Sequence, residues 1–374
     1  MTDNADHPVS LDPLDVLRVA VAHGLPGGEL ETAASGMELA LDDEVIALAV
    51  RHRVQGLLWT AINDGVVVGS DSLVEAARTA HADAIGHCAV SRATAALAVG
   101  TLANAGIDVR VLKGIAIAEL DHADPNERMF GDADLLVRRT DHGAALAALT
   151  SAGFVRAQPA VRGWWEQRFG KAIEFRAPTG GELDLHLVIT GGYFGERIDH
   201  DELWAATSVA FLVDGVDGRG LDREGRLLNA CCHAVLGGGS GLRALRDVAQ
   251  LVLISGADWQ TAVERARRDG CDLVIAGAVR STWTSLGLDH QHPLLQWAAD
   301  FVPDPAQERA FAGYTAARGE GWAPEGLSVL AALGPIDQAA FLAALAVPSR
   351  ASLRARDRTW PEHVRLGASS LRRH

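Results

Sequence analysis

Short apolar runs and helical patterns alternate in the middle of this chain. Residues 109–112 are apolar and predict a buried strand, Gly114 interrupts the run, and residues 115–120 have the apolar spacing of a helix. A polar loop then leads to residues 132–137 (Asp-Ala-Asp-Leu-Leu-Val), which predict a second strand. The pattern therefore predicts a strand, a glycine turn, a helix and a second strand in close succession.

Two carboxylates interrupt the apolar pattern of this second strand. Asp132 and Asp134 are two residues apart, so their side chains leave the same face of the sheet. Residues 182–188 alternate in the same way, with leucines on one face and Asp184 and His186 on the other. Carboxylates held side by side repel each other unless they bind a hard divalent cation, for which oxygen is the preferred ligand. If the two strands are neighbours, the pattern predicts a site of the kind used in two-metal phosphoryl or nucleotidyl transfer.

Helical patterns occupy most of the remaining chain. Before the first strand, apolar spacing predicts three helices, over residues 14–23, 42–62 and 72–105. Residues 172–176 form a predicted hairpin with the strand at 182–188, and residues 211–214 predict one further short strand that ends in an Asp-Gly turn. We expect four regions: a helical region 1–106, a catalytic domain 107–215, a helical domain 216–348 and a basic tail 349–374.

Length and charge narrow the class of protein. At 374 residues the chain is long enough for two or three modules, and its apolar fraction of 48% and charged fraction of 22% are ordinary for a globular protein. A net charge of −14 argues against an extended nucleic-acid partner, which would require a basic surface. A nucleotide substrate is compatible with this charge, because Mg²⁺ and a few local cations can neutralise a triphosphate.

The cysteine pattern and the hydropathy of the chain predict a cytoplasmic protein. Its four cysteines have no CxxC or zinc spacing, and we favour a partly buried helix over a metal site for Cys231, Cys232 and His233. The first residues lack the basic region and apolar core of a signal peptide, so none is expected. We expect no membrane partner, since no apolar stretch reaches the roughly 18 residues that a membrane span needs.

These motifs resemble those of the DNA polymerase β-type nucleotidyltransferase superfamily, and more narrowly those of a bacterial family of uncharacterised nucleotidyltransferases. The matching segments are Leu112-Lys113-Gly114, Arg128, Asp132 to Val137 and Leu183-Asp184-Leu185-His186. The resemblance extends over roughly residues 40–265. Ile115 stands where the wider superfamily usually has Ser, so a hydroxyl donor to the triphosphate is missing and Lys113 is the candidate substitute.

The resemblance implies an α+β fold: a polymerase β-like palm, with a small mixed sheet and helices, flanked by N- and C-terminal helical regions. It implies an Mg²⁺-dependent enzyme that moves a nucleoside monophosphate from a nucleoside triphosphate, with ATP expected, to a small-molecule or peptide acceptor in natural-product biosynthesis. The resemblance implies that three carboxylates, Asp132, Asp134 and Asp184, are catalytic and bind two Mg²⁺ ions. It implies that the nucleotide is bound by Lys113, Gly114, Arg128 and His186.

Several alternatives stay open. The same fold supports phosphoryl transfer or the transfer of AMP to a protein, and without the serine the module could be a non-catalytic nucleotide-binding or scaffold protein. Trp164 and Trp165 could stack a base or cover a sheet edge. Arg246 and Asp247 could order the substrate side of the cleft or form a salt bridge, which we favour.

Overall fold

A seven-stranded mixed sheet forms the centre of the protein, in a computed structural model that describes residues 11–28, 39–159, 162–236, 241–315, 324–355 and 357–371. Part of the predicted basic tail lies outside these residues. The strand order is β5-β6-β7-β4-β3-β9-β8. The strands are β3 (Arg110–Val111), β4 (Ala133–Leu136), β5 (Val155–Arg156), β6 (Ala172–Arg176), β7 (Glu182–His186), β8 (Val209–Val213) and β9 (Val216–Gly220). The fold is α+β, as predicted.

Strands β4 and β7 lie side by side in the sheet and run parallel. Asp134 is the register partner of Asp184, and Leu136 is the partner of His186. β7 also pairs antiparallel with β6, which is the predicted hairpin. All four residues of β4 are buried, because α5 and α6 both pack against this strand. The two strands that carry the predicted carboxylates are therefore neighbours.

The predicted strand at residues 211–214 is one arm of a hairpin. β8 pairs antiparallel with β9 through a turn in which Asp214 and Gly215 both have positive φ. The apolar pattern did not indicate β9, because Asp217, Gly218 and Gly220 interrupt it. β9 nevertheless joins the sheet by pairing with β3.

The predicted helix over residues 42–62 is two helices in the structure. α3 (Asp43–His52) ends at Arg53, whose φ of 54° is left-handed and whose amide donates to the carbonyls of Ala49 and Val50. α4 (Gln55–Asn63) begins two residues later. Apolar spacing continues across this break, so the pattern of side chains did not indicate it; the left-handed backbone at Arg53 ends the first helix.

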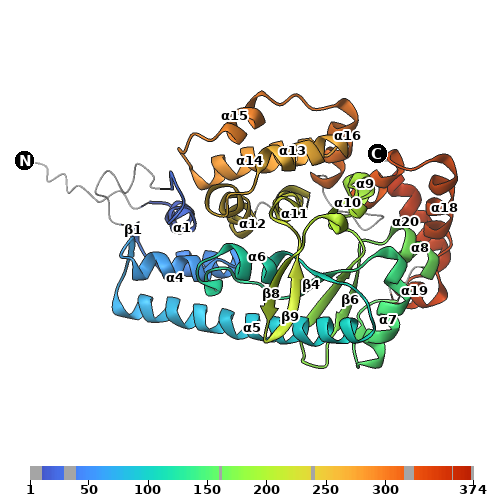
Figure 1. The fold of residues 1–374 in the computed structure, drawn as a ribbon, viewed down its shortest axis with the longest axis horizontal. Coiled ribbons are helices and arrows are strands. Elements are labelled where there is room, and N and C mark those ends of the chain that lie inside the picture. Colours follow the sequence, from blue (N-terminus) through green and yellow to red (C-terminus); the bar gives the residue numbers. More distant parts are fainter. Residues whose placement is uncertain are drawn as a thin grey trace, which may run out of the picture.

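The helices form layers on both sides of the sheet (Figure 1). The other helices before the C-terminal group are α1 (Pro13–Ala22), α5 (Asp71–Asn104), α6 (Lys113–Asp121), α7 (His142–Ser151), α8 (Gly163–Phe169), α9 (Gly192–Arg197), α10 (His200–Ala205), α11 (Arg223–Leu236), α12 (Leu242–Ala249), α13 (Trp259–Arg268), α14 (Asp272–Leu286), α15 (Pro293–Asp300) and α16 (Pro305–Thr315). A separate two-stranded sheet pairs β1 (Leu39–Ala40) with β2 (Val67–Val68). No helix in the described part of the chain combines the length and apolarity that crossing a bilayer requires.

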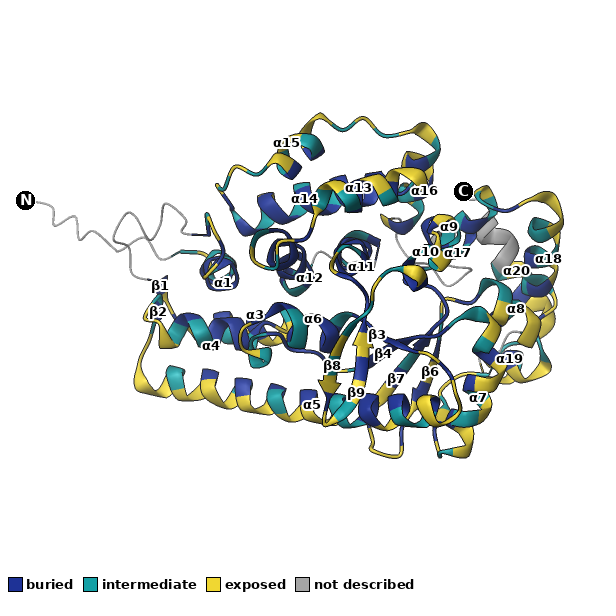
Figure 2. Ribbon diagram, viewed as in Figure 1, coloured by how far each residue is buried: buried dark blue, intermediate teal, exposed yellow. Residues whose placement is uncertain are grey.

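Two apolar cores hold these layers together. α5 crosses one side of the sheet and shares a core with the strands and α7. On the other side, α1, α3 and α4 share a second core with α11, α12 and α14. Figure 2 shows the buried residues concentrated in the central strands β3 and β4 and in α11 and α12, whereas α5 is exposed on the side turned away from the sheet. The predicted division into four regions stays a prediction.

A third, smaller apolar cluster packs residues between Leu327 and Leu345 against α8. The C-terminal helices are α17 (Pro324–Leu327), α18 (Pro335–Ala346), α19 (Arg350–Ala355) and α20 (Trp360–Leu371). The Phe341 ring on α18 lies 5.5 Å from the Trp165 ring and 5.3 Å from the Phe169 ring. Trp165 therefore packs against α18, whereas Trp164 is 50% exposed.

Candidate metal and nucleotide site

The turn between β3 and α6 brings the backbone close to its neighbours. Lys113, the first residue of α6, has a φ of 39°. Gly114 follows it, and a Cβ atom there would lie 2.7 Å from the Phe130 Cβ and 2.9 Å from the Arg128 Nη1. Glycine is the residue that fits this close approach. The turn predicted at Gly114 is thus present, directly before a helix.

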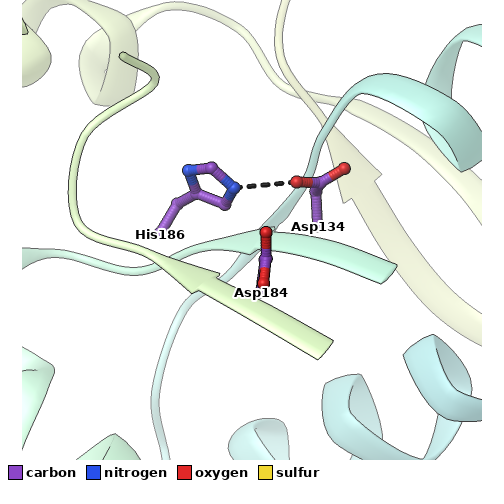
Figure 3. Close-up of side chains that lie close together, drawn as sticks. All are labelled: Asp134, Asp184 and His186. Atoms are coloured by element: carbon purple, nitrogen blue, oxygen red, sulfur yellow. Dashed lines mark hydrogen bonds and ion pairs between the residues drawn. The ribbon is translucent and has the colours of Figure 1, made fainter. Parts of the chain in front are cut away.

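Asp134, Asp184 and His186 meet on one face of the sheet (Figure 3). One ligand atom from each residue lies within 4.8 Å of the other two. Asp134 and His186 are buried and Asp184 is half-buried. The parallel register of β4 and β7 sets Asp134 beside Asp184, and His186 follows two residues further along the same face. Two carboxylates and an imidazole are a donor set that fits a divalent cation.

Asp132 lies just before β4 and beside this group. It is half-buried, and it does not belong to the set of mutually close ligand atoms found among the described residues. Its negative charge contributes to raising the pKa of Asp184, so the two carboxylates are near each other. Of the three predicted carboxylates, the structure brings two together with His186 and leaves the third at their side.

The Lys113 ammonium lies among these ligands. Its Nζ donates to the Asp134 Oδ1 at 2.5 Å and lies 3.3 Å from the His186 Nε2. The His186 Nε2 is itself 2.8 Å from the same oxygen, and the His186 Nδ1 faces the Val188 carbonyl oxygen at 3.2 Å. His186 therefore contacts Asp134 and not its strand neighbour Asp184. The predicted contacts of Lys113 and His186 with a nucleotide stay a prediction.

Burial and charge shift the pKa values of the site in opposite directions. Burial and the charge of Asp134 raise the pKa of Asp184 to about 6. Burial and the Lys113 ammonium lower the pKa of His186 to about 4, although Asp134 opposes this shift. Burial would also raise the pKa of Asp134, but the Lys113 ammonium holds it well below its usual range. At pH 7 Asp134 and Asp184 are largely ionised and the imidazole of His186 is neutral, which are the forms that ligate a metal.

Arg128 is held in a buried ion pair. Its Nε and Nη2 donate to the two carboxylate oxygens of Asp247 on α12, at 3.1 and 2.7 Å. Arg246 does not pair with Asp247; it donates to Gln250 and to backbone carbonyls at the C-terminal end of α1. The salt-bridge interpretation is therefore confirmed for Asp247, with Arg128 as its partner. The predicted contact of Arg128 with phosphates stays a prediction.

Two arginines near the carboxylates were not among the predicted site residues. The Arg53 guanidinium packs over Gly131, where a Cβ would lie 3.1 Å from its Nη1. Arg243 on α12 donates to the Met129 carbonyl oxygen at 3.1 Å. Burial lowers the pKa of Arg243 to about 10, and the charge of Arg53 acts in the same direction. Neither arginine has a carboxylate partner among the described residues.

Lys171 and His233 also lie near the site. Lys171 precedes β6 and is an exposed residue. Burial of its ammonium group nevertheless lowers the pKa of Lys171, and the charge of Lys113 acts in the same direction. Burial and then Lys113 lower the pKa of His233 on α11 to about 3. Composition could have indicated Lys171, because Lys113 and Lys171 are the only two lysines among 34 Lys and Arg residues. We find no comparable sequence signal for the two arginines.

Comparison with known proteins gives a family match and a distant structural similarity. Residues 40–282 match the model of a family described as uncharacterised nucleotidyltransferase. Among solved structures, the chain is similar to an antigenic nucleotidyltransferase-like protein from Paracoccidioides brasiliensis, with 19% identity and a TM-score of 0.30 over 54% of this chain and 94% of that chain. The search of curated proteins gives no match.

Proposed function

Because the chain belongs to the family of uncharacterised nucleotidyltransferases, we propose that it transfers a nucleoside monophosphate from a nucleoside triphosphate to a small-molecule or peptide acceptor. The acceptor atom attacks the α-phosphorus, the bond from that phosphorus to the β-phosphate oxygen breaks, and pyrophosphate leaves. The observation that carries the proposal is the combination of divalent-cation ligands with nearby cations that have no carboxylate partner among the described residues. A triphosphate substrate requires both the divalent cation and the additional positive charges.

The cations fit a polyphosphate. Arg53, Lys171 and Arg243 gather near the carboxylates in a chain whose net charge is −14. Positive charges held close together repel each other, and a bound anion removes that repulsion. Guanidinium groups bind phosphate oxygens with two parallel hydrogen bonds, and a lysine adds a compact point charge. We assign the β- and γ-phosphates, which leave as pyrophosphate, to these three residues together with Lys113.

The carboxylates fit the two Mg²⁺ ions that are the proposed cofactors. Asp134, Asp184 and His186 would hold one divalent cation, and Asp132 would complete a second position beside it. Carboxylates favour Mg²⁺, whereas an imidazole also suits Mn²⁺, so both ions belong in any assay. A bound divalent cation neutralises charge on the reacting phosphate and makes an acceptor hydroxyl more acidic.

Asp184 is the proposed general base. Without a bound metal ion, burial and the charge of Asp134 raise its pKa to about 6, so its carboxylate is ionised at neutral pH and can accept the proton of the acceptor group. We propose ATP as the donor and a metabolite or peptide of a natural-product pathway as the acceptor. Both choices follow from the family resemblance, and the acidic composition disfavours an extended nucleic acid.

Label transfer tests the reaction. Wild type, Asp134→Asn and Asp184→Asn are incubated with Mg²⁺ or Mn²⁺, a host-cell metabolite extract and each nucleoside triphosphate, labelled at the α- or the γ-phosphate. We expect wild type to transfer the α-label and release pyrophosphate, and Asp184→Asn to be slower by about 10²- to 10⁴-fold, the usual contribution of a general base. Asp217→Asn is the matched control, because this exposed carboxylate lies on β9, outside the site.

Each other outcome identifies a different function. Transfer of the γ-label would mean phosphoryl transfer, and an α-label on a protein band would mean AMP transfer to a protein. No transfer in any arm, with thermal stabilisation by nucleotide that survives both substitutions, would contradict the enzyme and leave a nucleotide-binding protein.

A further inference from the structure

Lys113 combines an unfavourable backbone with a buried charge. Its φ of 39° is left-handed, and it is one of four non-glycine residues with positive φ in the described part of the chain. Strain of this kind persists where the surrounding structure requires it. Its side chain is only 14% exposed, although lysines are seldom buried without a partner. The contacts of its ammonium group supply the reason.

The ammonium contacts two of the three candidate metal ligands. The Lys113 Nζ lies 2.5 Å from the Asp134 Oδ1 and 3.3 Å from the His186 Nε2, and these two ligand atoms are 2.8 Å apart. In Figure 3 the side chains of Asp134, Asp184 and His186 converge on a common space. The Lys113 ammonium therefore places a positive charge beside these ligands, as a bound metal ion would.

The Lys113 ammonium completes the contacts between Asp134 and His186. The His186 Nδ1 faces the Val188 carbonyl oxygen at 3.2 Å, and its Nε2 lies 2.8 Å from the Asp134 Oδ1. The Lys113 Nζ lies within hydrogen-bond distance of both the Asp134 Oδ1 and the His186 Nε2, so it bridges these two ligand atoms.

The identity of this cation is informative. Only two of the 34 Lys and Arg residues in the chain are lysines, and both are at this site. An arginine carries its charge on a planar fork that favours fixed bidentate pairs, whereas a lysine carries a compact charge on a flexible stem. A lysine therefore suits a position from which the charge must be able to move away.

We propose that Lys113 is a built-in counter-ion that occupies the metal position until a divalent cation displaces it. The inference rests on the proposed function, because the displaced ammonium then turns to the phosphates of the bound nucleotide. A metal ion alone must compete with the ion pair between Lys113 and Asp134, so it binds weakly. Once a nucleotide offers the ammonium a new partner, metal and nucleotide strengthen each other's binding.

Manganese binding to the full chain measures this competition. Free Mn²⁺ is followed by electron paramagnetic resonance during titration of wild type, Lys113→Met, Lys113→Arg and Lys171→Met without nucleotide, and circular dichroism verifies folding. We expect Lys113→Met to bind Mn²⁺ about tenfold more tightly than wild type, within the usual range of coupling between sites. Lys113→Arg keeps a cation and holds it in a more fixed pair, so it should bind Mn²⁺ no more tightly than wild type.

The matched control is Lys171→Met, because it removes the same charge near the site without vacating the position beside Asp134 and His186. Equal tightening in both methionine variants would mean a general electrostatic effect and would overturn the displacement. Mn²⁺ binding unchanged by Lys113→Met would overturn the displacement alone. Absence of Mn²⁺ binding in wild type and all variants would overturn the metal site and the proposed function with it.

The wild type gives a second test that does not depend on the folding of a variant. Because the chain has only two lysines, acetylation followed by peptide mass spectrometry reports on Lys113 and Lys171 separately. We expect Mg²⁺ to accelerate acetylation of Lys113 several-fold relative to Lys171, since the displaced ammonium loses its ion pair. An unchanged ratio at Mg²⁺ concentrations that bind the protein would overturn the proposal.

Discussion

Gly114 and Lys113 show how single residues shape the site. Gly114 allows Phe130 and Arg128 to approach the backbone, and Lys113 reaches the ligands of β4 and β7 from a left-handed conformation. Arg53, at the end of α3, is a second non-glycine residue with positive φ near the same carboxylates. Backbone strain of this kind is concentrated at functional sites, which agrees with the proposed nucleotide site.

Gly114→Ala should destabilise the protein. A Cβ at this position would lie 2.7 Å from the Phe130 Cβ, so the turn or its neighbours must shift, at a cost of about 1 to 3 kcal/mol. Chemical unfolding measures the change. Gly86→Ala is the control, because Gly86 is exposed in the middle of α5 with no atom within 4 Å of an added Cβ. That variant should be neutral or slightly more stable, and equal behaviour of the two would contradict the steric argument.

His200 makes the protein sensitive to acid. Its Nδ1 donates to the Ile198 carbonyl at 2.9 Å and its Nε2 accepts from the Ile189 amide at 3.2 Å, so both nitrogens are satisfied in the neutral ring. Burial lowers its pKa from 6.5 to about 4. Between these values the unfolded chain binds the proton and the folded protein does not. Stability therefore falls as the pH decreases through this window, by up to about 3 kcal/mol from this residue.

The measurement is the free energy of unfolding of wild type and His200→Gln at pH 7 and at pH 4.5. We expect the difference in stability between the two proteins to become smaller at the acidic pH, because the variant lacks the titrating ring. A difference that is independent of pH would show that His200 does not titrate as argued.

At the scale of elements, buried ion pairs connect α11 and α12 to the segment between β3 and β4. Arg226 on α11 donates to both oxygens of Asp121 at the end of α6, at 2.8 and 2.9 Å. Arg128 forms a bidentate ion pair of the same kind with Asp247 on α12. Both pairs join segments more than a hundred residues apart, so they fix α11 and α12 above the carboxylates. Arg243 is carried on α12 and is placed by the same contact.

Asp247→Asn should be strongly destabilising. The substitution keeps the shape of the side chain but leaves the buried Arg128 charge without an anionic partner, which costs about 3 to 5 kcal/mol. Urea unfolding measures this loss. Glu75→Gln, which removes the exposed ion pair with Arg78 on α5, is the control and should change nothing measurable. A loss as small as that of the control would mean that Arg128 finds another acceptor nearby.

At the scale of the whole molecule, charge and packing are unevenly distributed. The chain carries a net charge of −14, yet cations without carboxylate partners among the described residues gather beside the metal ligands. A locally positive charge attracts an anionic substrate and raises its local concentration. Of the C-terminal helices, α17 also contacts α9 and α16, whereas α18 packs on α8 through the small apolar cluster. The packing of α18 on α8 is therefore less extensive than that of the two main cores.

Phe341→Ala should loosen the C-terminal helices and leave the sheet folded. Phe341 is 4% exposed and packs on Trp165 and Phe169, and removing a buried phenylalanine ring costs about 3 to 5 kcal/mol. We expect limited proteolysis to cleave residues 324–371 faster than in wild type, because local opening follows local stability. Ile336→Ala on the same helix is the control, since Ile336 is 85% exposed. Identical digestion of wild type and Phe341→Ala would show that other contacts hold this segment.

The sequence alone determined the local features of the site. Alternation with a period of two residues placed Asp132 and Asp134 on one face of a strand and Asp184 and His186 on one face of another, and the motifs indicated the family that the comparison confirms. These features are local because side-chain direction along a strand depends only on the backbone of that strand. The α+β fold was expected from the family resemblance that these motifs carry.

The tertiary structure decided which of these faces meet and what else joins them. The parallel pairing of β4 with β7 set Asp134 beside Asp184, and the contact of His186 fell on Asp134. The partner of Arg128 proved to lie 119 residues away on α12. Such contacts depend on how elements that are distant in the sequence pack against each other. The spacing of residues within one segment does not determine that packing, because it involves side chains from many segments at once.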